Sequence, residues 1–364
     1  MTLDFYFLRR FLFSFLVMFG VIVLFVTLID LVEQMRRSAS IPLSEIMRDV
    51  ALQLPINLSL FFPLIMLLSA IGFASNLSRN SEFVVAQAYG RSIARNLIGP
   101  AVGMFCIGIG VVAILNPLVA YCEAEILQQD RGAEAREGSV LSIGDNGVWV
   151  RLQADGGYIV LRADRVNGRS LEFIDVTVLR YDENSIPLER ILAPRATLDA
   201  QGLWQMYGAS VWSLESDSFS AAPKQNTVVK FKSDIEQQDL WEDLSSPSMI
   251  SIWKLSSFIQ TLRNSGFETA KHEAWQLKEL MRPLFLMALG LIGALLSVRH
   301  FRAAGQAQSV VIGIGLGFSL HYMRDFSLIL AENGQIQPLL GAASPILAAA
   351  FIAASLIVVK DVQT

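Results

Sequence analysis

An uncharged, apolar run over residues 11–29 constrains the fold more than any other part of this sequence. It is about as long as the roughly 20 residues that a helix needs to cross a bilayer. The chain of 364 residues is 53% hydrophobic and 17% charged, whereas about a quarter of the residues in soluble domains are charged. A membrane protein is therefore predicted. The formal net charge of -4 argues against a nucleic-acid-binding protein, which would present a basic face.

Further apolar runs predict five more membrane spans, over residues 52–77, 97–118, 283–298, 310–330 and 338–359. Pro63 lies inside the second span, where a kink is tolerated in lipid. The third span contains Gly103, Gly108 and Gly110, and small residues of this kind favour close helix packing in a membrane. The sequence thus predicts six spans, three on each side of a large insert.

Basic residues concentrate in the loops on one side of these spans. They are Arg9, Arg10, Arg79, Arg91, Arg95, Arg299, Arg302 and Lys360. Because cytoplasmic loops carry an excess of Lys and Arg, this side and the N-terminus are predicted to be cytoplasmic. Arg36, Arg37 and Arg48 fall on the other side, but acidic residues accompany them.

The insert changes character after a charged helical extension of the third span. Short segments of alternating polarity follow, over residues 147–152, 158–166, 171–181, 189–198, 202–214 and 227–232. Gly, Asn and Asp turn signals separate them, which is typical of antiparallel strands. Strands without interleaved helices favour a sandwich or jelly roll. The alternation breaks near Asp175, which predicts a bulge. Residues 247–266 return to a helix with a broad apolar face, either interfacial or docked on a domain.

Signatures of catalysis are missing from the sequence. His272-Glu273 resembles the start of a zinc-protease helix, but Gln276 stands where the second histidine is required. The remaining histidines lie in other segments, and there is no G-x-S-x-G elbow or Walker A loop. We expect no metal, no cofactor and no enzymatic activity of the chain alone.

Charged residues inside the predicted spans are the stronger functional signal, because they are costly in lipid and usually face a cavity or another subunit. Arg324, Asp325 and His321 lie in the fifth predicted span, and Asp30 ends the first. An internal ion pair is one interpretation. The other is that the first and fifth spans line a cavity in which these groups meet a polar lipid headgroup.

The cytoplasmic loop between the second and third spans, residues 79–96, reads RNSEFVVAQAYGRSIARN. Ser81 is a predicted helix start and Gly90 a predicted helix stop. A short helix with an apolar side beneath a membrane domain suits docking to a soluble partner. An ordinary solvated turn is the alternative.

Three local motifs carry a resemblance to a known family. They are LVEQMRR at residues 31–37, SEFVVAQAYG at residues 81–90, and LRNSG at residues 262–266 followed by Glu273 and the segment 278–283. With three spans, a β insert and three more spans, the chain resembles the LptF/LptG (YjgP/YjgQ) lipopolysaccharide export permeases. The resemblance covers nearly the whole chain, and the third motif is more similar to the LptG member.

The resemblance implies a fold and a location. The chain would be an α-helical membrane protein of the bacterial inner membrane with six transmembrane helices and an inserted periplasmic all-β, jelly-roll-like domain. Residues 1–120 would hold the first three spans with a cytoplasmic coupling helix near residues 81–90. Residues 121–248 would form the β domain with its helical lead-in, and residues 249–364 periplasmic helices leading into the last three spans.

The resemblance also implies partners and site residues. LptF and LptG pair as the membrane half of an ABC transporter that passes lipopolysaccharide to a periplasmic bridge. The expected partners are an LptF-like six-span protein, an LptB-like ATPase dimer and an LptC-like single-span periplasmic protein. The expected ATPase-coupling residues are Glu82, Phe83, Val84, Gln87, Tyr89, Gly90 and Arg91. The expected lipid-binding residues are Asp30, Gln34, Arg36, Arg37, His321, Arg324 and Asp325. At Asp30 the chain departs from members that carry a lysine there.

Two other functions remain open at this point. A membrane-embedded lipid-modifying enzyme would need a nucleophile or metal constellation. An ABC-linked mechanotransmission protein without a transport path would have a polar, closed β domain and no ordered lipid between its spans. Bound lipopolysaccharide and a co-purifying ATPase would separate these functions from a permease.

Overall fold

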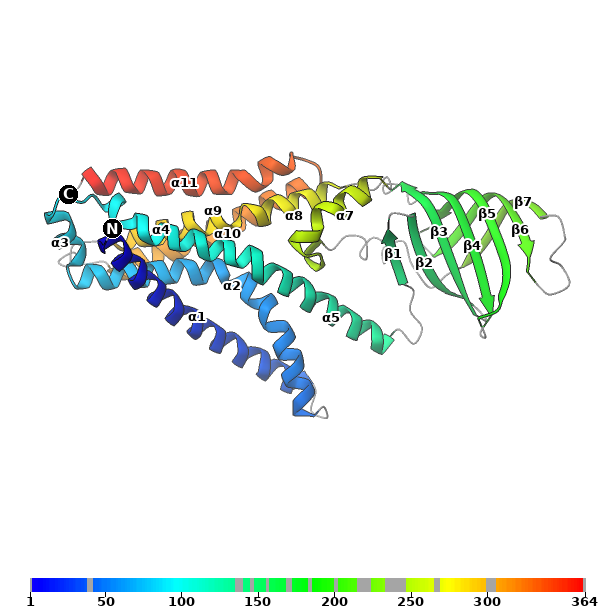
Figure 1. Cartoon of the computed structure of the whole chain (residues 1–364), viewed down its shortest axis with the longest axis horizontal. Helices are drawn as coiled ribbons and strands as arrows, with labels where there is room; N and C mark the ends of the chain where they lie inside the picture. The colour runs from blue at the N-terminus through cyan, green and yellow to red at the C-terminus, as the bar shows by residue number, and fades with distance from the viewer. Residues whose placement is uncertain are drawn as a thin grey trace. The chain divides into compact units, whose positions relative to one another are not determined.

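The computed structural model of the chain is mainly helical, with one β-sheet near the middle of the sequence (Figure 1). The structure describes residues 2–37, 42–134, 140–144, 147–154, 157–167, 172–182, 185–199, 202–214, 224–232, 247–264, 269–298 and 306–362. Contacts divide the chain into two compact units. The first, the membrane unit, comprises Met1–Ile126, Ser248–Trp253 and Glu273–Thr364, and the second, the sheet unit, comprises Leu127–Pro247 and Lys254–His272.

Helices make up both ends of the chain. Those before the sheet are α1 (Thr2–Arg37), α2 (Leu43–Arg79), α3 (Glu82–Ala88), α4 (Ile93–Gly110), a π-helical turn (Val111–Leu115) and α5 (Asn116–Glu134). Those after it are a 3-10 turn (Pro247–Met249), α7 (Ile252–Asn264), α8 (Ala270–Leu280), α9 (Arg282–Ser297), α10 (Gln306–Glu332) and α11 (Pro338–Val362). α8 and α9 are bent by 49° relative to each other. Pro283, in the first turn of α9, suits such a break because it has no N–H to donate to the preceding turn.

Several helices are long and apolar enough to cross a membrane, as expected. Within the described residues they are Leu3–Arg36, Leu43–Arg79, Ile93–Ile126 and Pro338–Lys360, and the bent pair α8 and α9 makes a fifth if it is counted as one span. α10 is not among them, although its 27 residues are sufficient in length. It carries His321, Arg324 and Asp325, which lower its apolar character. A count of six spans therefore does not follow from helix length and composition.

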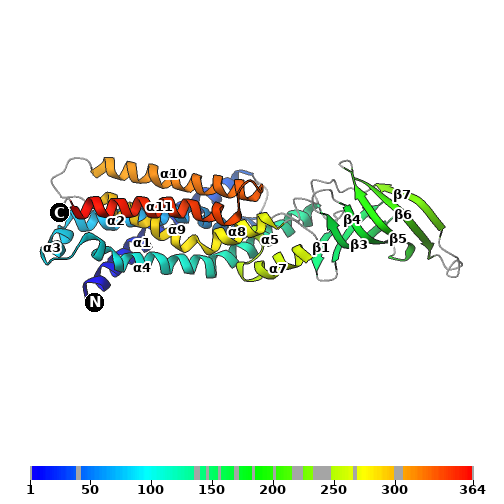
Figure 2. The same cartoon turned by 90° about the horizontal axis from the view of Figure 1, so that it is seen from above.

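α9 is the central helix of the membrane unit. It contacts α2, α4, α10 and α11 (Figure 2), and twelve of its 16 residues are buried. A helix that is apolar on all sides is expected in the interior of a bundle. The sequence of α9 and its position therefore agree.

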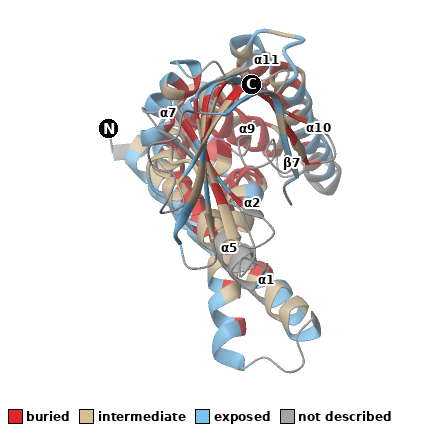
Figure 3. Cartoon of the chain, turned by 90° about the vertical axis from the view of Figure 1, so that its right-hand side faces the viewer, coloured by how far each residue is buried: buried red, intermediate tan, exposed pale blue. Residues whose placement is uncertain are grey.

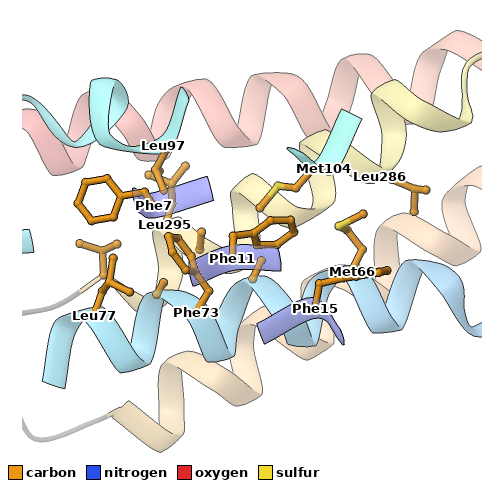
Figure 4. Close-up of a cluster of buried hydrophobic side chains, with 14 of the residues drawn as sticks. Phe7, Phe11, Phe15, Met66, Phe73, Leu77, Leu97, Met104, Leu286 and Leu295 are labelled. Carbon is orange, nitrogen blue, oxygen red and sulfur yellow. The ribbon is translucent and has the colours of Figure 1, made fainter. Parts of the chain in front are cut away.

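Aromatic side chains attach one face of α1 to this bundle (Figure 4). Phe7, Phe11 and Phe15 recur every four residues, a spacing that puts them on one helix face. Phe11 meets Phe73 of α2 edge to face, with ring centroids 5.9 Å apart. The other face of α1 is exposed, which suits contact with lipid or another membrane protein. Its large apolar residues include Phe13, Leu16, Val17, Val21, Leu24, Phe25 and Leu28.

The glycines of the third predicted span differ in their packing. A methyl group added at Gly103 would lie 2.6 Å from Leu8 Cδ1, and one added at Gly108 would lie 2.5 Å from Pro283 Cα. The predicted close packing is thus confirmed at these two positions. At Gly110 an added methyl group meets nothing within 4 Å among the described residues, so the described part of this chain gives Gly110 no close neighbour.

The substitution Gly108→Ala is expected to destabilise the membrane unit by about 1–3 kcal/mol, since overpacking forces neighbouring backbone to move. Gly110→Ala is the matched control, because its methyl group has open space. Thermal unfolding of the two purified variants measures the difference. Equal melting temperatures would contradict the close approach of α4 to α9.

The described residues of the sheet unit contain seven antiparallel strands in chain order. They are β1 (Val140–Gly144), β2 (Gly147–Ala154), β3 (Gly157–Asn167), β4 (Glu172–Asp182), β5 (Pro187–Leu198), β6 (Leu203–Ser213) and β7 (Lys224–Lys232). The all-β insert is therefore present. Its described strands form one curved sheet, paired in chain order (Figure 3), whereas the sequence favoured a sandwich or jelly roll, in which two sheets face each other.

A row of irregular residues crosses the middle of the sheet. Asp175 lies opposite Pro194, and Pro194 lies opposite Gly208. Asp175 and Gly208 have positive φ angles of 55° and 66°. The buried positions of β4, β5 and β6 all change parity at this row while the pairing register is kept. The irregularity expected near Asp175 is thus an in-register bend and not an inserted residue, and the register shift of β4 lies between Arg180 and Tyr181.

One face of the sheet is apolar and carries α7. Phe258 and Leu262 of α7 pack against a core that includes Trp204, Phe173 and Leu161. The predicted apolar helix is therefore docked on the β domain, which was one of the two alternatives.

Candidate functional site

The short helix α3 lies between α2 and α4, as its start and stop signals predict. Ser81 precedes it in the left-handed region, with φ of 58°, and its side chain makes no capping hydrogen bond. Gly90 follows it with φ of 77°, a conformation that favours glycine. Gly90 thus ends α3 as expected. Ser81 precedes the helix as expected, but it contributes a left-handed backbone conformation and no side-chain cap.

Polar contacts attach α3 to the first turns of α1. The Tyr6 hydroxyl donates to Glu82 Oε2 at 2.9 Å, and Arg10 Nη2 lies 3.3 Å from Glu82 Oε1. Beyond the helix, Arg91 forms an ion pair with Asp4. The carboxylate expected to meet an ATPase is therefore engaged within the chain.

An aromatic contact adds to these polar ones. The Phe83 ring stacks on Phe7, with centroids 5.9 Å apart, and it meets Phe73 edge to face. Phe83 is buried. Stacked and edge-to-face rings are favoured over other arrangements. Movement of α3 would therefore carry the start of α1 with it.

The opposite side of α3 is exposed and apolar. Val84, Val85 and Tyr89 are 44%, 55% and 82% exposed, while Gln87 is half-buried. The predicted coupling residues therefore divide into two groups. Glu82, Phe83 and Arg91 face α1, and Val84, Tyr89 and Gly90 are open to a partner.

The residues predicted at the far end of α1 do not gather into one site. Asp30 accepts a hydrogen bond of 2.8 Å from Asn57 Nδ2 of α2. Arg36 lies 3.3 Å from Glu33, one turn before it, and is largely exposed. Gln34 is half-buried. The side chain of Arg37 lies outside the described residues.

The other predicted lipid-binding residues lie together in the membrane unit. His321, Arg324 and Asp325 of α10 line a cavity of about 360 Å³, with residues of α2, α5 and α8 on its other walls. No α1 residue is among those lining it in the described part of the chain. Asn57 of α2 lines the cavity and also donates a hydrogen bond to Asp30, so α2 contacts both Asp30 and the cavity.

A buried ion pair forms one wall of this cavity. Arg282 Nη1 donates to Glu279 Oε2 at 2.9 Å, and the two side chains are only 5% and 2% exposed. Arg282 Nη2 also donates to the backbone oxygen and the hydroxyl of Ser59, at 2.6 and 2.9 Å. This pair joins the α8–α9 bend to α2.

Arg324 is buried without such a pair among the described residues. It is 6% exposed, and its guanidinium carbon lies 4.8 Å from the centroid of the Phe285 ring. Its Nε and Nη1 atoms have no hydrogen-bond acceptor in the part of the chain that the structure describes. A buried donor of this kind is costly unless a ligand or water satisfies it.

Sequence reasoning missed Lys278, Glu279 and Arg282 as cavity residues. They precede an apolar run, where charges ordinarily reach the membrane interface. Their spacing did contain a signal, because residues 278 and 282 are one turn apart and lie on one side of a helix. The bend at α9 turns that side inwards.

The π-helical turn Val111–Leu115 directly precedes α5, which forms part of the cavity wall. Trp253 Nε1 donates to the backbone oxygen of Ala113 at 3.4 Å, and the backbone N–H of Ile252 donates to Asn116 Oδ1 at 3.0 Å. π-Turns inside α-helices occur frequently at functional sites. Asn116 and Glu123 line the cavity.

Comparisons with known proteins give the family of the chain. The family model "Lipopolysaccharide export system permease LptF/LptG" matches residues 5–358. The lipopolysaccharide export system permease protein LptG of Escherichia coli (strain K12) is 23% identical over 304 residues, which cover 81% of this chain and 80% of that protein. LptG of Haemophilus influenzae is 23% identical over 290 residues, which cover 75% and 74%. The chain therefore belongs to the LptF/LptG family of lipopolysaccharide export permeases.

Proposed function

We propose that this chain is the LptG-type, six-span subunit of an inner-membrane ABC transporter that extracts lipopolysaccharide and passes it to a periplasmic bridge. An LptB-like ATPase dimer, an LptF-like six-span protein and an LptC-like single-span protein would complete the machine. The observation that carries the proposal is α3, because its inner side is attached to α1 and its outer side is open. The proposal builds on the family, whose members are permeases of lipopolysaccharide export.

Transmission runs from the ATPase through α3 to α1. An ATPase that closes on nucleotide would displace Val84 and Tyr89, and the contacts of Glu82 and Phe83 would pull the start of α1. α1 would act as a lateral gate for lipid. A hinge or shear motion of this kind requires packed contacts between the moving elements.

Two further observations support six spans in this orientation. The charges of α10 face a cavity, which makes a span with three ionisable residues tolerable in lipid. Lys360 Nζ donates to the backbone oxygen of Val298 at 2.7 Å, and Ser78 Oγ to that of Ser297 at 3.4 Å. The ends of α2, α9 and α11 thus meet, and their basic residues favour the cytoplasm. The sheet unit would then be periplasmic.

The substrate path would begin with the predicted lipid-binding residues. Gln34, Arg36 and Arg37 would meet headgroups at the periplasmic end of α1, and the cavity of Arg324 would lie deeper. The apolar interior of the β domain, which is buried in this structure, would have to open to accept acyl chains as lipopolysaccharide leaves the membrane.

Purification of the tagged full-length chain in mild detergent tests the proposal. A P-loop ATPase, a second six-span permease and bound lipopolysaccharide are expected in fixed proportion by mass spectrometry. A lone chain with hydrolytic activity would favour a lipid-modifying enzyme. An ATPase complex without any bound lipopolysaccharide would favour mechanotransmission.

The substitution Tyr89→Asp is expected to weaken ATPase association about tenfold or more, because exposed aromatic residues often dominate interfaces, with effects of ~2 kcal/mol. Tyr121→Asp is the matched control, since Tyr121 is also exposed but belongs to α5. The ratio of ATPase to permease after purification measures the effect. Unchanged ratios in both variants would remove α3 from the docking surface.

A further inference from the structure

We infer that Glu123 of α5 and Arg324 of α10 form an ion pair in a second conformation of the membrane unit, in which α5 swings about the π-helical turn and closes the cavity that both residues line. The conformation seen in this structure is then the open one. The switch is a property of this chain by itself and does not depend on the proposed partners. Three features carry it: the position of Arg324, the charges that remain unpaired, and the attachment of α5.

Arg324 lies in the middle of the face by which α10 packs on its neighbours. α10 contacts α9, α11 and α2 (Figure 2). The buried residues of its described part fall on one helix face, and they are Gly313, Gly317, Leu320, Arg324, Ser327, Leu328 and Ala331. Arg324 is the charged residue among them. A charge on a packing face is costly unless it is paired, so a partner is expected in at least one conformation.

Two groups of opposite charge are left unsatisfied on the wall of the cavity. Arg324 Nε and Nη1 are buried without an acceptor among the described residues, and Glu123 Oε2 is buried there without a donor. The cavity has a volume of about 360 Å³. Water can satisfy both groups while a polar cavity of this size is open. When the cavity closes and the water leaves, each charge needs the other.

The other carboxylates of the cavity wall already have partners. Glu279 accepts from Arg282 at 2.9 Å, and Asp325 Oδ2 lies 3.5 Å from His321 Nε2. Glu123 is thus the carboxylate still available among the described lining residues.

The charges of the cavity wall are balanced. Its described carboxylates are Glu123, Glu279 and Asp325, and its described lysine and arginines are Lys278, Arg282 and Arg324. Closing the cavity therefore buries no net charge, apart from any proton on its histidine. A wall of this composition can satisfy itself when its helices come together, without a ligand.

The attachment of α5 permits such a movement. Hydrogen bonds to Ala113 and Asn116 hold the base of the helix at the π-helical turn. Beyond the base, Glu125 forms an exposed ion pair with Arg48 of α2, and exposed pairs contribute little to stability. α4, before the turn, packs more extensively, against α1 and α9. Hinges are a few residues at the end of an element, and the π-helical turn has this position.

The length of the lever is sufficient. Glu123 lies seven residues beyond Asn116, which is about 10 Å along the helix, so a swing of about 20° moves it by about 4 Å. Opening exposes the Arg324 guanidinium to the cavity, and closing withdraws it. The switch therefore controls whether the cavity is accessible.

Distances between spin labels test the switch. Cysteines introduced at Tyr121 of α5 and Phe326 of α10, both exposed, would carry the labels. The native Cys106 and Cys122 would be replaced by alanine, so that no other thiol reacts. The full-length protein, with any proteins that co-purify, would be reconstituted in lipid nanodiscs. Two distance populations are expected, which correspond to the open and the closed cavity.

Substitution of either charge should remove the closed conformation. The shorter population is expected to fall about tenfold or more in Glu123→Gln and in Arg324→Gln. The exchange of both charges, Glu123→Arg with Arg324→Glu, should restore it, which a general loss of packing would not allow. Arg48→Gln is the matched control, because its pair with α5 lies outside the cavity and is exposed. It should keep the shorter population.

The same distance distribution in the unsubstituted protein and in both glutamine variants would overturn the ion pair, and would mean that water satisfies both groups. If Arg324→Gln does not fold, Arg324→Lys keeps the charge and should keep the shorter population, and its loss there would also overturn the pair. Labels on Phe326 and on Leu347 of α11 give a reference distance. A change in that distance between conformations would overturn the hinge in the π-helical turn. No substrate or nucleotide is needed, so these outcomes are separate from those that test the proposed function.

Discussion

The charge reversal Glu82→Lys is expected to reduce lipopolysaccharide export about tenfold or more. The free energy that corresponds to a loss of this size lies within the range of coupling free energies between two linked sites of a protein. The introduced ammonium group would face Arg10 and could not accept the hydrogen bond of the Tyr6 hydroxyl, so α3 would release the start of α1. The fold should survive, because an exposed ion pair contributes only about 0–1 kcal/mol to stability. Export to the cell surface and the melting temperature of the purified complex measure the two effects.

An exchange of charges decides where Glu82 acts. The double variant Arg10→Glu with Glu82→Arg restores the ion pair with its partners exchanged, and the Tyr6 hydroxyl can then accept from the introduced guanidinium. Recovery of export is expected if the pair transmits motion within the chain. An exchange variant as defective as Glu82→Lys alone would mean that Glu82 acts directly on the proposed ATPase partner.

The second large effect is expected from Arg282→Met, which should destabilise the membrane unit by about 3–5 kcal/mol. The substitution leaves the Glu279 carboxylate buried at 2% exposure with no cation bonded to it, and it removes the donors to Ser59. Thermal unfolding in detergent measures the loss. Arg48→Met is the matched control, since its pair with Glu125 is exposed and should contribute at most about 1 kcal/mol.

The double variant Glu279→Leu with Arg282→Met should recover most of this loss, because a buried ion pair can often be replaced by apolar residues at little cost. Equal melting temperatures of Arg282→Met and Arg48→Met would contradict the burial of the pair. A double variant as unstable as the single one would mean that the bonds to Ser59 stabilise more than the ion pair does.

The helices of the membrane unit were predictable because long uncharged runs have few alternatives in lipid. The motif around α3 was predictable for a different reason, since Gly90 has the φ angle that its residue type favours. α10 was predicted as a span from its apolar run, but it is not among the helices that are apolar enough to cross a membrane, since Arg324 and Asp325 lower its apolar character.

Only some of the charged residues that line the cavity could be predicted from the sequence. Arg324 and Asp325 stand out in sequence as charges within an apolar run. Lys278 and Glu279 do not, because the same charges at the edge of a run ordinarily reach water. The bend between α8 and α9 accompanies their burial; Pro283 marks the position of this bend in the sequence, but its direction depends on tertiary packing.

Six of the seven described strands, β2 to β7, were predicted from alternation, whereas β1 and the shape of the sheet were not. Pairing in chain order depends on contacts between strands. The bend at Asp175, Pro194 and Gly208 is a property of three strands together. The sequence of a single strand shows only that the alternation of apolar and polar residues changes parity along it.

The number of residues in the π-helical turn between α4 and α5 fixes the rotation of one helix relative to the other. Each residue of an α-helix advances the chain by about 100°, from 3.6 residues per turn. Asn116, Val119 and Glu123 line the cavity after the turn, while Gly108 meets α9 before it. Deleting one residue from Val111–Leu115 would rotate one of these faces away from its neighbour by that angle. Homologous chains that share this cavity should therefore tolerate substitutions within the turn far better than any change in its number of residues.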